Sequence, residues 1–308
     1  TGTVFTAVGF FLLTFITVDR PLWYMMIAIF VIGLGLGQMM QTLVLASQNA
    51  VKPADMGVAT SASTFFRQIG GTIGVALMLS VLFTVLPGNI VSSIADRPTL
   101  SSALNAALNP KVATAPQNKA VMKQLWTPIV TPIESGIQKQ LDSGAAQATT
   151  AADAAVTQQV TAAVQARVDA GTIPAAAAPA IIAQQVEAAK PVAEKAALAA
   201  VADKAHATVV GSRVQVDWAN ASQRSYWVDQ LTPTLEKQIT ANGSKASSAS
   251  SSSTSDTSFL NGADHRLTKP FLVGFNDSVI TIFWIGLGVI LLAFILTWFF
   301  RVPPLRQV

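Results

Sequence analysis

One arginine, Arg67, lies near the start of a long apolar stretch, STFFRQIGGTIGVALMLSVLF, at residues 63–83. A charged side chain at the centre of a lipid bilayer costs about 2.5–3.5 kcal/mol on insertion scales. Such an arginine needs a polar partner, a water-filled cavity or a membrane interface within reach of its guanidinium group. The stretch therefore predicts either a buried helix of a soluble protein or a membrane helix whose arginine finds one of these surroundings.

Three glutamines, Gln38, Gln41 and Gln48, lie on one side of another apolar stretch that begins at Leu22. At about 100° per residue, their side chains fall within an arc of roughly 80° around a helix. Polar side chains at membrane depth tend to face a bundle interior or a water-filled cavity. Gln38 and Gln41 are therefore candidates for lining a substrate pathway, with interhelical hydrogen bonds as the alternative. We expect Gln48 at the membrane edge.

No residues form a pattern that indicates an enzyme. The two histidines, His206 and His265, are far apart in the sequence, and the chain has no cysteine, so it has no disulfide and no thiolate metal site. We find no nucleophile with a base at a suitable spacing and no phosphate-binding loop. The net charge of +4 is not gathered in a basic patch with aromatic residues, which argues against a nucleic-acid partner. We expect no enzyme activity, no metal and no cofactor.

Composition indicates a membrane protein with a lipid bilayer as its partner. Hydrophobic residues make up 51% of the chain and charged residues only 12%, whereas soluble domains carry about 25% charged residues. Because a spanning helix needs about 20 mainly apolar residues, the sequence predicts four spans. They lie at about 3–18, 22–46, 57–86 and 279–300.

A large alanine-rich insert, residues 87–243, separates the third span from the fourth. Within it, valines at four-residue spacing predict an amphipathic helix that Gly171 ends. Four aromatic residues suit a modest core. A serine-rich linker and re-entry segment follow at 244–270, and the final span and tail occupy 271–308. The valines are Val156, Val160, Val164 and Val168, and the aromatic residues are Trp126, Trp218, Tyr226 and Trp227.

Glycines in the second and third spans have the spacing of helix-packing motifs. Gly33 and Gly37, and again Gly70 and Gly74, form small-x-x-x-small pairs, with Gly71 beside the second pair. Small residues at this spacing let the backbones of membrane helices approach closely. We expect these glycines to serve helix packing.

The stretch GLGLGQMMQTLVLASQNAVKPADMGVATSASTFFRQIGGTIGVAL, residues 33–77, resembles the late helices of the 14-helix drug:proton antiporters of the major facilitator superfamily, the EmrB/QacA-like group. The resemblance implies an all-α membrane protein whose four spans are the last four helices of the carboxyl-terminal lobe. It also implies a multi-pass protein of the plasma membrane, with cytoplasmic chain ends and an extracytoplasmic helical insert. Arg67 then becomes a gating residue or a contact at the cytoplasmic end of its helix, with direct contact to substrate or to a coupling carboxylate as the alternative.

The same resemblance implies efflux of amphipathic drugs or metabolites by proton-coupled antiport and alternating access. The chain opens without a methionine, so we expect a fragment whose amino-terminal part is missing. No Asp or Glu lies within a span, and Asp277 lies only at the lip of the last one, so the proton-binding group is expected in that missing part. Two alternatives remain: a membrane-anchored extracytoplasmic binding module, and an importer of the same superfamily.

Overall fold

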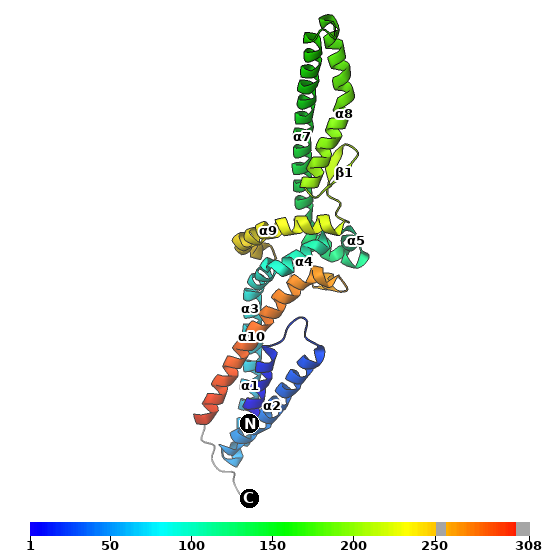
Figure 1. The fold of residues 1–308 in the computed structure, drawn as a ribbon. Coiled ribbons are helices and arrows are strands. Elements are labelled where there is room, and N and C mark those ends of the chain that lie inside the picture. The colour runs from blue at the N-terminus through cyan, green and yellow to red at the C-terminus, as the bar shows by residue number, and fades with distance from the viewer. Residues whose placement is uncertain (251–256, 300–308) are drawn as a thin grey trace. The chain divides into compact units, whose positions relative to one another are not determined.

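A computed structural model describes residues 1–250 and 257–299 of the chain, without the side chains of 242–250. The chain divides into two compact units, each built almost wholly from helices (Figure 1). The membrane unit comprises Thr1–Leu100, Leu235–Thr257 and Thr268–Val308, and the insert unit comprises Ser101–Thr234 and Ser258–Leu267.

The described part of the membrane unit contains four apolar helices: α1 (Gly2–Leu13), α2 (Leu22–Asn49), α3 (Met56–Ala95) and most of α10 (His265–Phe299). Among the described residues, α2, α10 and α3 with its preceding 3-10 turn (Pro53–Asp55) are long and apolar enough to cross a membrane, and α1 is a shorter apolar helix. At 1.5 Å per residue, α3 and α10 measure about 60 and 50 Å. Since the hydrocarbon core is only about 30 Å thick, both helices extend beyond it.

The boundaries of three helices differ from those expected. Helix α1 ends at Leu13, before the expected end at 18. There the hydroxyl of Tyr24 donates to the carbonyl of Leu12 at 2.7 Å, and the amide of Asn276 donates to the carbonyl of Ile16 at 3.1 Å. These side chains satisfy carbonyls that a longer helix would have bonded internally. Helix α3 continues past 86 to Ala95, and α10 begins at His265 rather than near 279.

Close backbone contacts at glycines hold the membrane unit together. A Cβ atom added to Gly35 in α2 would lie 2.6 Å from the backbone nitrogen of Thr6 in α1. One added to Gly274 in α10 would lie 2.6 Å from the Cα of Ile90 in α3. Because real Cβ atoms do not approach backbone atoms this closely, only glycine fits at these two helix crossings.

Two long antiparallel helices, α7 (Thr127–Asp169) and α8 (Ala178–Lys204), dominate the insert unit. The predicted amphipathic helix is confirmed, because Val164 is buried against Ile173 and Ala178, with Val160 and Val168 beside it. The predicted end at Gly171 is confirmed as well. This glycine has a φ of 68°, in the left-handed region that ends helices.

A second hydrophobic cluster lies at the other end of the pair. It contains Ile137, Leu141 and Ala145 of α7 and Leu198 and Ala202 of α8, with Trp218 and Trp227 packed against it. The helices α7 and α8 therefore have a hydrophobic cluster near each end and an alanine-rich seam between the two.

The expectation of an all-α protein is wrong in one place. Strands β1 (Thr208–Val210) and β2 (Arg213–Gln215) form an antiparallel hairpin in which Val209 pairs with Val214. The β-branched residues favour strands, and Gly211, with a φ of 64°, permits the tight turn between them. Val214 is fully buried against the second hydrophobic cluster, which explains why this short hairpin forms.

The rest of the insert unit contains most of α4 (Arg97–Ala107), α5 (Pro110–Ala113), α6 (Lys119–Val121) with a π-helical turn (Met122–Trp126), and the first half of α9 (Ala221–Ser250). Two further 3-10 turns lie at Pro116–Asn118 and Ala175–Ala177, and another lies at Ser258–Leu260. The backbone of α9 continues through 244–250, the first part of the expected serine-rich linker. Residues 251–256 lie outside the described residues.

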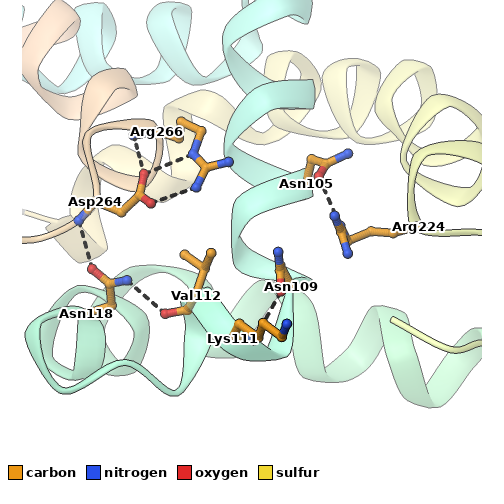
Figure 2. Close-up of polar contacts among 8 residues, drawn as sticks. All are labelled: Asn105, Asn109, Lys111, Val112, Asn118, Arg224, Asp264 and Arg266. Atoms are coloured by element: carbon orange, nitrogen blue, oxygen red, sulfur yellow. Dashed lines mark hydrogen bonds and ion pairs between the residues drawn. The ribbon is translucent and has the colours of Figure 1, made fainter. Parts of the chain in front are cut away.

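Hydrogen bonds fasten the returning segment 258–267 to the start of the insert. The backbone nitrogen of Asp264 donates to Oδ1 of Asn118 at 2.7 Å, and Nδ2 of Asn118 donates to the carbonyl of Val112 at 2.8 Å (Figure 2). Nε1 of the buried Trp126 donates to the carbonyl of Leu267 at 3.0 Å. We call the hydrogen bonds of Asn118 with Asp264 and of Trp126 with Leu267 the clasp, because each joins residues more than 140 positions apart.

Replacing Gly274 tests the crossing of α3 and α10. We expect Gly274→Ala to destabilise the purified protein by about 1–3 kcal/mol, because the new methyl group collides with the backbone of Ile90. Gly288→Ala, in the same helix, has no atom within 4 Å of the new methyl and gains about 1 kcal/mol of helix propensity. Thermal unfolding in detergent distinguishes the two. Equal melting temperatures for both variants would contradict the observed crossing.

Replacing Trp126 tests the clasp. Trp126→Phe removes the donor to the carbonyl of Leu267, and we expect a loss of about 1–3 kcal/mol in the stability of the insert unit. Trp227→Phe is the matched control, because Nε1 of Trp227 is buried without a hydrogen-bond partner and its removal breaks no hydrogen bond. Urea unfolding followed by circular dichroism measures both. A Trp227 variant that loses as much stability as the Trp126 variant would show that the hydrogen bond is not what matters.

Candidate functional site

The three glutamines of α2 have different surroundings. Gln38 is exposed, and its Oε1 accepts a hydrogen bond from Oγ1 of Thr1 at 3.1 Å. Gln41 is exposed and has no side-chain hydrogen bond within the described part of the chain. Gln48 is half-buried and donates from Nε2 to Oγ1 of Thr60 in α3 at 3.0 Å. Gln48 therefore links α2 to α3, whereas the amide groups of Gln38 and Gln41 are accessible from outside the membrane unit.

Arg67 lies on an exposed face of α3 and forms no ion pair or hydrogen bond with any residue in 1–241 or 257–299. Its neighbours are the exposed aromatic rings of Phe65 and Phe66, which meet edge to face with centroids 5.7 Å apart. A permanently charged guanidinium group in apolar surroundings needs an acceptor. That acceptor must come from outside the described part of the chain.

The glycines expected to pack helices face open space within this chain. A Cβ atom added to any of them would meet nothing within 4 Å. Their role in packing therefore stays a prediction, and it now concerns contacts with groups beyond the described residues. The glycines are Gly33, Gly37, Gly70, Gly71 and Gly74.

Polar contacts that we did not predict join α3, α10 and the segment after α1. Nδ2 of Asn89 donates to Oγ of the buried Ser278 at 3.0 Å, and Lys269 pairs with Asp19 at 3.2 Å. Each of these residues lies just beyond an apolar run, which is the one signal that the sequence offered. Their pairing depends on how the helices cross, and no local pattern records that.

The insert unit contains a buried arginine with neutral partners. Arg224 is 7% exposed, and it donates to Oδ1 of Asn105 at 2.9 Å and to the carbonyl of Trp218 at 2.6 Å (Figure 2 shows the first of these). Loss of hydration lowers the pKa of this guanidinium group. Uncharged acceptors can satisfy its hydrogen-bond donors without placing a second charge in the interior, so Arg224 is best understood as a tie between α4 and α9.

Two aspartates of the insert unit have lowered pKa values. The guanidinium of Arg266 donates twice to Asp264 (Figure 2) and lowers the pKa of that carboxyl group. The hydrogen bond from Arg213 does the same for Asp142. Because the folded-state pKa lies below the unfolded value, these pairs stabilise the fold at neutral pH and lose their effect as pH falls through the folded pKa. Neither pair joins a group of three or more potential metal ligands in the described parts of the chain.

Part of the chain is similar in sequence to proteins that include two named as transporters. It is 34% identical over 133 residues to the multidrug transporter protein MdtP of Bacillus subtilis, which covers 42% of this chain and 24% of that protein. It is 34% identical over 132 residues to an uncharacterized MFS-type transporter of Mycobacterium tuberculosis, covering 43% of this chain and 18% of the relative. A tetracycline resistance determinant of Streptomyces rimosus is 33% identical over 70 residues, 23% of this chain and 20% of that protein.

These similarities define a class of protein. No family model matches the chain, and no solved structure matches it. The chain spans about a quarter or less of the length of these curated relatives. Within residues 1–250 and 257–299, three helices are long and apolar enough to span a bilayer. The chain is therefore a membrane protein related in sequence to transporters of the major facilitator superfamily, and none of the relatives named above is named as an enzyme.

Replacing Gln48 and Gln41 separates the two kinds of glutamine. We expect Gln48→Ala to lower the stability of the purified protein by about 0.5–1.5 kcal/mol, because it removes a hydrogen bond between α2 and α3. Gln41→Ala removes no such bond and should leave the melting temperature unchanged. Thermal unfolding in detergent measures both variants. A stability loss for Gln41→Ala equal to that for Gln48→Ala would place Gln41 in a structural contact instead.

Proposed function

We propose that the chain is the carboxyl-terminal part of a multidrug or metabolite efflux transporter of the major facilitator superfamily, in the 14-helix antiporter group. The observation that carries this proposal is the similarity to a multidrug transporter protein, together with the apolar helices of the membrane unit. The similarity to a second relative, a tetracycline resistance determinant, agrees with an amphipathic small molecule as substrate.

Gln38 and Gln41 are the residues we assign to the substrate pathway. Their amide groups can donate and accept hydrogen bonds, which suits substrates that combine apolar rings with a few polar groups. Both side chains are exposed in the membrane unit, so a neighbouring helix of the complete transporter or a water-filled pathway can lie against them. Hydrogen bonds from Gln38 and Gln41 would then orient the substrate, while the apolar walls supply most of the affinity.

Proton coupling in this proposal uses a group outside the chain. A proton-coupled carrier needs a titratable side chain in its pathway, and the apolar stretches contain no Asp or Glu. Asp277 lies in α10 beside Ser278 and Asn276, where α10 contacts α3 and the segment after α1. We therefore assign to this chain substrate contacts and helix packing, and to the rest of the protein the exchange of the proton.

The two alternatives differ in what the insert does. In a transporter, α7 and α8 would be an accessory outside the membrane, with the chain ends in the cytoplasm. In an anchored binding module, the insert unit would carry the activity and the apolar helices would only attach it. An importer of the same superfamily would share every feature described for this chain and differ only in the direction of transport.

Efflux from cells that express the full-length protein tests the proposal. We expect a protonophore to abolish efflux of a lipophilic cationic dye, and Gln38→Ala and Gln41→Ala each to reduce it several-fold at normal expression. Deleting 148–195 and closing the gap with a short Gly/Ser turn removes about half of α7 and two-thirds of α8 but keeps the second hydrophobic cluster. This deletion should spare efflux.

Three outcomes would contradict the proposal. If the deletion of 148–195 abolishes efflux while Gln38→Ala and Gln41→Ala keep wild-type efflux, the binding module is favoured. Dye accumulation driven by the protein favours the importer. Efflux that persists in the presence of the protonophore contradicts the proposed proton coupling.

A further inference from the structure

Contacts within the membrane unit show which residues of its helices lie at the same depth. Helices α3 and α10 are antiparallel and meet where Asn89 contacts Ser278. Arg67 precedes Asn89 by about 22 residues in α3, and Trp298 follows Ser278 by about 20 residues in α10. Because the two helices are antiparallel, Arg67 and Trp298 lie on the same side of this contact. At 1.5 Å per residue these distances are about 33 and 30 Å. Arg67 and Trp298 therefore lie at the same level to within about one helical turn.

Aromatic residues also mark the opposite end of the membrane unit. Trp23 and Tyr24 begin α2, and the guanidinium carbon of Arg20 lies 5.1 Å from the centre of the Tyr24 ring. The hydroxyl of Tyr24 donates a hydrogen bond to the carbonyl of Leu12 in α1. Phe10, also in α1, contacts Phe283 of α10 with ring centroids 6.2 Å apart. Leu12 lies two residues beyond Phe10 in α1, so its level corresponds to a point in α10 two residues before Phe283. From that point to Trp298 is about 17 residues of α10, or roughly 25 Å. Two aromatic levels at this separation match the boundaries of a hydrocarbon core about 30 Å thick.

The surroundings of Arg67 are those of a side chain at such a boundary. The nearby Phe65 and Phe66 are 57% and 71% exposed, and Trp298 and Phe299 at the same level are each 80% exposed. No acidic residue within 1–250 or 257–299 pairs with Arg67. The guanidinium group offers five donors in a planar fork that matches the oxygens of a phosphate group.

We propose that Arg67 binds the phosphodiester group of a membrane lipid at the bilayer face where α2 ends and α3 begins. Phe65, Phe66, Trp298 and Phe299 are exposed aromatic residues at the same level. The charge of Arg67 is then satisfied by lipid rather than by substrate or by a carboxylate of the protein. The proposal rests on the position of the bilayer and holds whether the protein exports, imports or only anchors. It also places Gln48 and Thr60 beyond the hydrocarbon, and by the same count along α2 Gln41 lies at the level of Arg67.

Spin labels on the full-length protein, freed of other cysteines and reconstituted in phosphatidylglycerol and phosphatidylethanolamine, test the depth. We expect a label at Phe66→Cys to lie near the phosphate level. A label at Ile73→Cys, an exposed position seven residues along α3, should lie about 10 Å deeper. Power saturation with oxygen and a water-soluble nickel complex measures both depths. A label at Phe66→Cys that reaches neither reagent, or that lies near the bilayer centre, overturns the proposal.

Thermal unfolding in detergent tests the phosphate contact. Adding phosphatidylglycerol should raise the melting temperature of the wild type and of Arg67→Lys, and the rise should fall by at least half in Arg67→Gln. Inorganic phosphate at the same concentration should cause no rise. If Arg67→Gln lowers the melting temperature equally with and without lipid, the partner is a protein carboxylate and the proposal fails. If Arg67→Gln does not fold, the label depths decide, because both labelled variants retain Arg67.

Discussion

A bilayer provides no hydrogen-bond partners in its interior, and this constraint explains how polar residues are used in the membrane unit. The hydroxyl groups of threonines along the apolar helices donate hydrogen bonds to backbone carbonyls one turn earlier. Thr6 donates to Gly2, Thr42 to Gln38 and Thr72 to Gln68. Such side chains need no neighbour and can face lipid. Gln41 and Arg67 have no internal partner of this kind in the described residues, which is why they attract functional interpretation.

The same constraint explains where the helices of the membrane unit contact one another. In an apolar solvent, contact between helices gains little from the hydrophobic effect, so close packing and short polar contacts must supply the attraction. Gly35 and Gly274 allow the backbones to meet, and Asn89 and Ser278 add a hydrogen bond beside the second crossing. Other glycines of α2 and α3 also leave room for close backbone contact, but no described residue lies within 4 Å of a Cβ atom added to them. They are Gly33, Gly37, Gly70, Gly71 and Gly74. Surfaces of this kind suit further helices, as the proposed larger transporter requires.

The sequence predicted the apolar helices, the valine stripe of α7 and its end at Gly171, because these depend on local periodicity and on one residue's backbone freedom. It did not predict that α3 and α10 extend past the apolar runs, since the helical backbone continues through polar residues once another helix packs against it. It could not distinguish Gly35 from Gly33 and Gly37, because spacing alone does not say which side of α2 meets α1. The β-hairpin was missed because three-residue strands are too short to show alternation.

The clasp has a consequence for how the insert can vary. Asn118 and Trp126 hold the returning segment beside the departing one, so the chain between them begins and ends at neighbouring points whatever its length. Adding or removing matched turns in α7 and α8 would leave those points in place, because the two helices are antiparallel and both lie between the clasped segments. The lengths of α7 and α8 are therefore free to change during evolution by paired insertions and deletions, without altering the apolar helices of the membrane unit.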